Sequence, residues 1–205
     1  MNSFSGTGWT DAVSVAAYGS YTQGAFYADA LAGYAYSNNQ LQRQIAFPGL
    51  TQRTANGSTG ANQFLGQAEL GYKVPVYAAA AATLTPFARL QVMSVSQNGF
   101  SETGANSLSL NVQQQTTNSL RSTLGAELAG AIPLSEGRSL DLALRLGWQH
   151  EYAYTGRPIT AAFAGAPAAS YTVYGATPQL DAALIGFSAP VSVREGSSSS
   201  GHGGT

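Results

Sequence analysis

The sequence contains no cysteine, and only 9% of its residues are charged. The missing cysteine excludes disulfides, thiolate nucleophiles and cysteine-ligated zinc sites. In a typical soluble domain about a quarter of the residues are charged, so a surface of this composition would be hard to keep in aqueous solution. The net charge is −1 and Lys73 is the only lysine, which excludes the basic surface of a nucleic-acid-binding protein. We therefore expect no nucleic-acid partner.

Long hydrophobic runs are missing as well. The nearly apolar stretch 74–84 falls short of the roughly 20 residues that a transmembrane helix needs. Residues 1–11 lack the charged and apolar regions of a signal peptide, so any export signal is expected outside this sequence.

Motifs that carry catalytic chemistry are also absent. The sequence has no phosphate-binding loop, no dinucleotide fingerprint, no Gly-x-Ser-x-Gly elbow and no metal-ligand spacing. His150 stands next to Glu151, but neighbours on one strand point to opposite faces, so they do not form an acid–base pair. We expect no enzyme, no metal and no cofactor.

What the sequence does contain is hydrophobic alternation with a period of two, which is typical of β-strands. Turn-forming pairs interrupt it at Gln23-Gly24, Asn38-Asn39, Asn56-Gly57, Asn98-Gly99 and Glu136-Gly137. The pattern predicts an all-β, antiparallel up-and-down meander. Its strands are expected near 11–22, 25–38, 41–55, 62–76, 82–97, 106–113, 118–133, 139–153, 159–174 and 181–193.

Charged residues keep to one face of these strands. In 139–153 the even positions carry four leucines followed by Trp148, His150 and Tyr152, whereas the charges lie at odd positions. The same separation holds in 25–38, 62–76, 82–97 and 118–133. The predicted charged face consists of Asp29, Glu69, Lys73, Arg89, Arg121, Glu127, Asp141, Arg145 and Glu151.

The two faces predict an inverted barrel. A soluble barrel would turn its apolar face inward and cover its outside with lysine and glutamate. Here the charged face nearly balances acids against bases, as a water-filled or plugged lumen requires, and the other face is apolar enough to meet lipid. Because Arg121, Glu127, Asp141, Arg145 and Glu151 lie on neighbouring predicted strands, cross-strand ion pairs are expected among them.

Several aromatic residues lie toward the predicted strand ends. Such residues form girdles at the two interfaces of a membrane, although tyrosine is also favoured in any strand. The candidate membrane-interface aromatics are Tyr34, Tyr36, Tyr72, Trp148 and Tyr152.

Several ordered stretches resemble a known family. They begin with Leu84-Thr-Pro-Phe-Ala-Arg-Leu90 and Asn98-Gly-Phe-Ser-Glu-Thr-Gly-Ala105, and continue with 117–125, 144–152 and 159–173. These blocks are similar to the C-terminal translocator, or β-domain, of bacterial autotransporters, the type V secretion proteins. The resemblance covers roughly residues 11–189.

This resemblance implies a twelve-strand barrel in the outer membrane of a Gram-negative bacterium. Its pore would serve export of a covalently linked passenger and be threaded by a helical linker, and the barrel-assembly machinery would be a further partner. Against that pattern, residues 1–193 are expected to form part of the barrel, without its opening strands, linker helix and closing strands. Residues 194–205 are rich in glycine and serine and are expected to be a disordered tail.

The resemblance therefore predicts an outer-membrane translocator or anchor for a passenger absent from this chain, with lipid as its solvent. A general outer-membrane pore or adhesin-type barrel and a soluble lipocalin-like carrier remain as alternatives. The charged face could hold the linker or passenger in the pore, or its residues could merely satisfy one another and fix the register. Some autotransporters cut their own linker with lumenal carboxylates, but no residue here identifies that activity.

Overall fold

A computed structural model describes residues 6–47, 49, 51–134, 138–153, 156–175 and 179–193, most of which lie in strands. Its main sheet is an antiparallel meander that follows the order of the chain, which confirms the predicted fold class. The sheet consists of β1 (Gly6–Gln23), β2 (Phe26–Ile45), β3 (Arg53–Tyr72), β5 (Ala82–Gln97), β8 (Gln115–Pro133), β9 (Arg138–Glu151) and β12 (Asp181–Ser188). Two short strands, β4 (Val74–Tyr77) and β13 (Val191–Val193), pair with β5 and β9.

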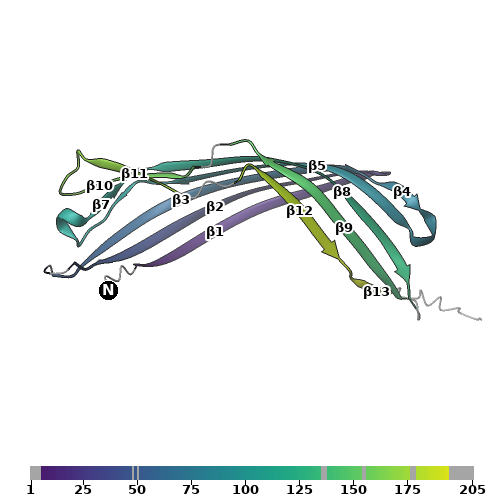
Figure 1. Ribbon diagram of the computed structural model, residues 1–205, viewed down its shortest axis with the longest axis horizontal. Helices are drawn as coiled ribbons and strands as arrows, with labels where there is room; N and C mark the ends of the chain where they lie inside the picture. The colour runs from purple at the N-terminus through teal and green to yellow at the C-terminus, as the bar shows by residue number, and fades with distance from the viewer. Residues whose placement is uncertain are drawn as a thin grey trace, which may run out of the picture.

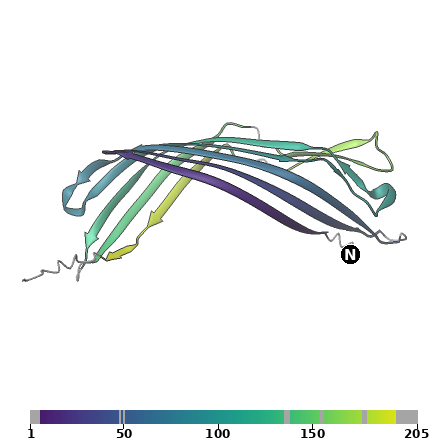
Figure 2. The same cartoon turned by 180° about the vertical axis from the view of Figure 1, so that it is seen from behind.

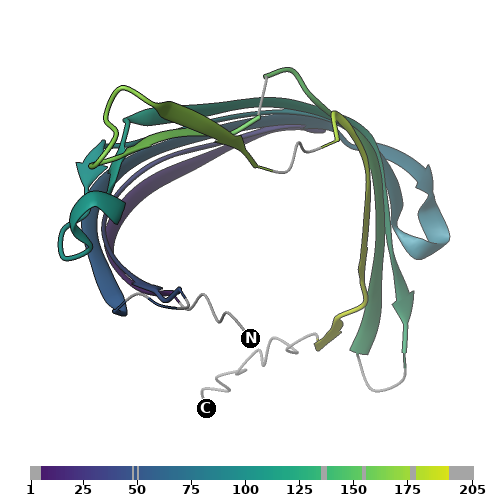
Figure 3. The same cartoon turned by 60° about the vertical axis from the view of Figure 1, so that its left-hand side comes forward.

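The main sheet is bent into an arch. Figures 1 and 2, taken from opposite sides, show long strands that run obliquely along it. Seen along the strands, β1 and β12 lie at the two ends of the arch and the space between them is open (Figure 3). Within the described residues β1 pairs only with β2 and β12 only with β9, so these two edges do not meet. The shape is that of a segment of barrel wall.

A smaller sheet lies beyond the main sheet in the direction of its strands, at the strand ends that carry the long connections (Figure 1). It has the strand order β11 (Ser170–Tyr174), β10 (Pro158–Phe163), β7 (Leu110–Val112) and β6 (Phe100–Ser101). These strands belong to the two long connections, from β5 to β8 and from β9 to β12. The opposite end has tighter connections, such as the turn at Gly24 between β1 and β2, where φ is +60°. Bacterial outer-membrane barrels have this asymmetry, with short periplasmic turns and longer extracellular loops.

Helices contribute little to this fold. Among the described residues there are two 3₁₀ helices of three residues each, η1 (Ala78–Ala80) and η2 (Asn106–Leu108). In the part of the chain that the structure describes, no helix has the length and apolarity needed to cross a membrane.

Two predicted turns are wrong. Asn38-Asn39 lies inside β2, where Asn39 pairs with Thr10 on one side and Thr59 on the other, and Asn56-Gly57 lies inside β3. The predicted strands 25–38 and 41–55 are therefore not separate units, because β2 continues to Ile45. Asparagine favours turns when it stands alone, but ladders on both sides of Asn38-Asn39 satisfy its backbone, and the β2 ladder together with the Asn56–Thr103 bridge does so at Asn56-Gly57. This pairing outweighs the local preference.

Other predicted strands are divided. The segment 159–174 forms β10 and β11, joined by a turn in which the Ala166 amide donates to the Phe163 carbonyl over 2.9 Å. The segment 106–113 forms η2 and β7, and the segment 181–193 forms β12 and β13. The strands of the small sheet also leave the predicted meander. The Glu136-Gly137 turn and the 194–205 tail lie outside the described residues.

The remaining predicted elements are confirmed within a few residues. Strand 82–97 coincides with β5, and 11–22, 118–133 and 139–153 lie within or close to β1, β8 and β9. The segment 62–76 covers the end of β3 and most of β4. The turn at Asn98-Gly99 separates β5 from β6.

Hydrophobic burial is sparse in this structure. A small core of Ile45, Ala55 and Ala105, with Leu108 packed against it, lies where the connection after β5 meets β2 and β3. In the main sheet, the buried side chains are mostly polar or charged and stand at odd positions: Thr59, Glu69, Thr85, Ser119, Thr123 and Glu151. The leucines at even positions are largely exposed, as in Leu144 at 40% and Leu124 at 55%. The main sheet is thus inverted relative to a soluble protein.

One close contact on the polar face requires glycine. A Cβ placed on Gly125 would stand 2.6 Å from the tip of the Phe87 ring and would also overlap the Leu146 carbonyl oxygen. We expect Gly125→Ala to lower the free energy of unfolding by about 1 to 3 kcal/mol, the usual cost of overpacking. Urea unfolding in lipid vesicles measures this loss. Gly19→Ala is the matched control, because an added Cβ there meets no atom within 4 Å, and equal stability of both variants would contradict the prediction.

Candidate functional site

The charged face of the sheet is its concave face. Arg145 Nη2 on β9 lies 2.7 Å from Glu69 Oε1 on β3, although β5 and β8 stand between these strands. On a flat sheet three strand spacings would separate the two backbones by roughly 14 Å. The two side chains can meet only if the sheet curves around them, so Glu69 and Arg145 point into the hollow of the arch.

Glu69 is the centre of a cluster in this hollow. Its carboxylate accepts hydrogen bonds from the Tyr27 hydroxyl at 2.8 Å, from Arg89 Nε at 2.6 Å and from Arg145. Arg145 also lies 3.4 Å from Glu127, and its guanidinium carbon stands 3.7 Å from the centre of the Phe87 ring. Five strands, β2, β3, β5, β8 and β9, therefore contribute side chains to this network, and every hydrogen bond to the Glu69 carboxylate is charge-assisted.

An open pocket of about 310 Å³ adjoins this cluster. Asp29 and Lys73 line it together with Glu69, Glu127 and Arg145. Asp29 accepts a 2.5 Å hydrogen bond from Ser20, and neither Asp29 nor Lys73 forms an ion pair with another described residue. The pocket thus offers one carboxylate and one ammonium group whose charges are not matched by the wall itself.

A second charged cluster lies toward the long connections. Glu151 is 5% exposed and accepts hydrogen bonds from Ser119 at 2.5 Å, Arg121 at 2.9 Å and the backbone amides of Leu120 and Ala153. This arrangement fastens the end of β9 to β8.

The predicted charged face is therefore three groups and not one network. Glu69, Glu127 and Arg145 line the pocket together with Asp29 and Lys73, and Arg89 pairs with Glu69 beside it. Arg121 pairs with Glu151. Asp141 stands apart and accepts hydrogen bonds from Ser139 and Ser192. It does not join the other charges because it lies on β9 near the opposite end of the strand from Glu151.

The convex face carries an apolar band with aromatic residues near its edges. On β3 the band runs from Phe64 to Tyr72, and on β9 from Leu140 to Trp148, close to the roughly 9–11 residues of a transmembrane strand. The candidate interface aromatics all lie near its limits. Tyr72 marks the end with short turns, and the end with long connections has Tyr34, Tyr36, Trp148 and Tyr152.

Polar partners accompany the aromatics at the end with long connections. His150 Nδ1 lies 2.8 Å from an Asp181 carboxylate oxygen, which also accepts the Trp148 indole N–H at 3.0 Å. The Tyr152 hydroxyl is 2.9 Å from that of Ser122. Rings with one polar contact and one apolar side suit the boundary between lipid and water.

Sequence reasoning missed several residues of the concave face and the connection above it. Tyr27 and Phe87 interrupt the simple polar pattern, so alternation did not identify them. Arg43, from β2, pairs with Glu102 over 2.6 Å and reaches the Leu108 carbonyl. Glu102 belongs to the 98–105 block that carried the family resemblance, and that block was the available signal.

The structure explains the 98–105 block. Glu102 also accepts the Leu110 amide at 2.9 Å, while Gly104 has a φ of +92° and a Cβ there would stand 2.5 Å from the Thr54 carbonyl oxygen. Ala105 is fully buried in the small core. The block therefore folds the connection after β5 back against β2 and β3.

Residues 1–203 match the sequence profile of the autotransporter β-domain. The chain belongs to the autotransporter β-domain family. It is also similar to the curated proteins named Esterase EstA of Pseudomonas aeruginosa and of Pseudomonas putida, at 30% identity over 175 residues in each case. The alignments cover 84% of this chain and 26% of each esterase, so the chain spans about a quarter of the length of these relatives.

Membership places this β-domain in the outer membrane of Gram-negative bacteria, where the family serves as the translocator of a passenger domain. The concave ionic face and the convex apolar band agree with that environment, since lipid surrounds such barrels and water fills them. The lipocalin-like alternative is wrong, because a soluble carrier would not expose its leucines and bury its glutamates.

Proposed function

We propose that this β-domain anchors and exports a passenger whose linker passes along the concave face and is held by Asp29 and Lys73. The observation that carries the proposal is the pocket beside Glu69, in which one acid and one base stay free of ion pairs with the described wall. A passing segment that carries both signs of charge would complete these pairs. The tight Glu69–Arg145 cluster would then form the rigid floor on which the segment rests.

The same geometry favours weak binding of the linker over tight binding. Exposed ion pairs contribute only about 0 to 1 kcal/mol each, so Asp29 and Lys73 would hold a linker weakly while it moves. Stronger holding would need the buried carboxylate of Glu69 or the partly buried Arg145, but these two side chains are already paired with each other. The pocket therefore favours transit and light retention over tight binding.

The chain's partners and chemistry follow from this role. We infer that lipid covers the convex band, that the barrel-assembly machinery inserts the β-domain, and that the residues Asp29, Glu69, Lys73, Arg89, Arg121, Glu127, Asp141, Arg145 and Glu151 line the lumen. We further infer that the β-domain itself performs no catalysis. Any activity comparable to that of the esterase relatives would belong to a passenger.

The position of the passenger can be tested by photo-crosslinking in cells that express the full-length protein. A photo-reactive amino acid at Asp29, on the concave face, is expected to crosslink to the passenger or its linker during export. The same amino acid at Ala30 is the matched control, because this neighbour points to the convex face. It is expected to react with lipid and not with the passenger.

Each outcome bears on the proposal. A passenger adduct from position 29 but not from position 30 supports a path along the concave face. Equal adducts from both positions, or adducts from position 30 alone, would show that the passenger takes another route.

A further inference from the structure

On the convex face of β1, β2 and β3, the residues beyond the apolar band are mostly polar. On β1 the outward positions from Tyr21 to Val13 are uncharged and mostly apolar, and Asp11 is the first charged one. Trp9 lies further on, about 13 Å along the strand from Val13 at roughly 3.3 Å per residue. Trp9 is 61% exposed, and its position four residues beyond Val13, which pairs with the girdle residue Tyr36, places it outside the aromatic girdle.

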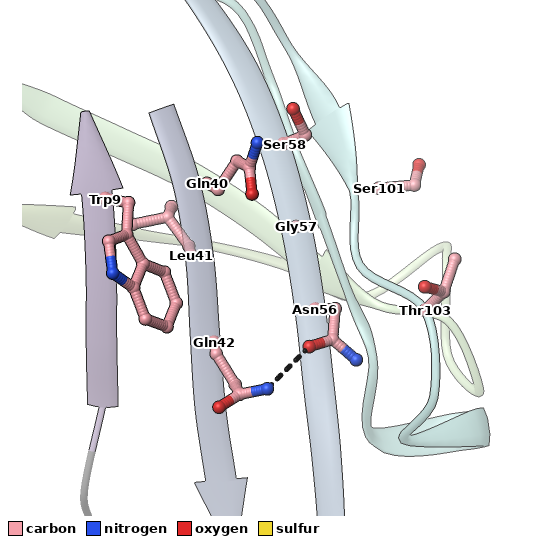
Figure 4. A pocket seen from close by; sticks show the side chains of 9 residues that line it. All are labelled: Trp9, Gln40, Leu41, Gln42, Asn56, Gly57, Ser58, Ser101 and Thr103. Atoms are coloured by element: carbon pink, nitrogen blue, oxygen red, sulfur yellow. Dashed lines mark hydrogen bonds between the residues drawn. The ribbon is translucent and has the colours of Figure 1, made fainter. Parts of the chain in front are cut away.

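A pocket of about 550 Å³ opens beside this tryptophan (Figure 4). Trp9 comes from β1, Gln40 and Gln42 from β2, and Asn56 and Ser58 from β3. The connection after β5 forms the far side, where Thr103 pairs with Asn56 through two backbone hydrogen bonds of 2.8 Å each. Three strands and a loop thus form the pocket at the strand ends that carry the long connections.

The lining is rich in hydrogen-bonding groups that stay available. Gln42 Nε2 donates to Asn56 Oδ1 over 3.1 Å, and this contact fixes both side chains (Figure 4). It leaves the Gln42 carbonyl oxygen and the Asn56 amide nitrogen without a partner among the described residues. The Gln40 carboxamide likewise has no partner there. Each carboxamide can both donate and accept.

The charge and shape of the lining select a class of ligand. Its residues include no acid and no base, so it does not favour a phosphate or an ammonium group. An exposed indole next to paired carboxamides suits a ring with a C–H face and hydroxyl groups at its edge. A neutral hexose has both features.

We propose that this pocket binds a neutral sugar unit of lipopolysaccharide. The pocket opens outward, just past the apolar band on the side of the long connections, where the sugars of the outer leaflet surround the barrel. A lipid-borne saccharide would reach it without leaving the membrane surface. The inference uses the outer-membrane placement of the chain but does not depend on the path of the passenger.

The test titrates the full-length protein in detergent with saccharides released from lipopolysaccharide by removal of the lipid. Calorimetry is carried out with the long-chain polysaccharide, with the core saccharide alone and with dextran as an unrelated neutral polymer. We expect the long-chain polysaccharide or the core saccharide to bind, and Trp9→Ala to weaken that binding about tenfold, equivalent to about 1.4 kcal/mol. Tyr77→Ala is the matched control, since this tyrosine is 64% exposed at the opposite end and should leave binding unchanged.

The remaining outcomes are equally informative. Binding of the core saccharide alone assigns the site to the inner sugars, and binding of only the long chain assigns it to the outer repeat units. Equal affinity for dextran, no binding at all, or an unchanged Trp9→Ala variant would overturn the proposal. A change of oligomeric state in Trp9→Ala would also overturn it, because it would identify a protein–protein surface. Export of the passenger by Trp9→Ala should remain normal, which separates this test from that of the proposed function.

Discussion

Leu144→Arg is expected to lower the free energy of unfolding of this β-domain by roughly 2 to 4 kcal/mol. Leu144 lies near the middle of the convex band on β9, between Leu140 and Trp148, and is 40% exposed on that face. An arginine there would have to leave its charge in hydrocarbon or bend toward the interface. Urea unfolding of the full-length protein in lipid vesicles, followed by fluorescence, measures the loss.

Gln149→Arg is the control for this change because it adds the same side chain to the concave face of the same strand. Gln149 already contacts Gln91 across the hollow at 3.4 Å, so water and polar groups would receive the charge. We expect a loss within about 0.5 kcal/mol, as for most substitutions in polar surroundings. Equal tolerance of arginine at both positions would refute the assignment of the two faces.

Glu69→Gln is expected to destabilise the β-domain by about 3 kcal/mol, toward the lower end of the cost of breaking a buried ion pair. The change removes the negative charge that Arg89 and Arg145 share, and it leaves two guanidinium groups facing each other. The Glu69 side chain is 7% exposed and the two arginine side chains are 23% exposed, so water relieves only part of the repulsion. The shift in urea midpoint measures the effect.

A second substitution separates charge from packing at this site. Glu69→Gln combined with Arg89→Gln removes one of the two opposed cations and should recover part of the lost stability. Asp29→Asn is the matched control, because Asp29 is exposed and accepts a single hydrogen bond from Ser20, and its loss should stay below about 1 kcal/mol. If the double variant were less stable than Glu69→Gln alone, charge repulsion would not be the cause.

The separation of the two faces could be predicted from the sequence because it depends on local alternation alone. Leu144 and Arg145 must point to opposite sides of any strand that contains them, whatever the strand pairs with. Strand 82–97 could be placed for the same reason. Which face is concave, however, depends on the curvature of the whole sheet, and the Glu69–Arg145 contact shows that curvature directly.

Other features required knowledge of pairing. Asn38-Asn39 and Asn56-Gly57 have the chemistry of turns, and only the ladders between β1, β2 and β3 show that they lie in continuous strands. Above the membrane both faces of a strand meet water, so the hydrophobic alternation that marks a strand disappears. Phe87 was hidden for a different reason, since it fills the space above Gly125 on a face predicted to be polar.

The unequal lengths of the strands give the barrel wall an uneven rim. β2 and β3 contain 20 residues each and continue well past the convex band, while β9 ends at Glu151 and β12 begins at Asp181, close to the limit of that band. Figure 1 shows the small sheet beside the long ends of β2 and β3. A polypeptide that leaves the lumen would be shielded on the side of β2 and β3 and would first meet open solvent above β9 and β12. The unequal strand lengths would thus direct the emerging chain toward the side of β9 and β12.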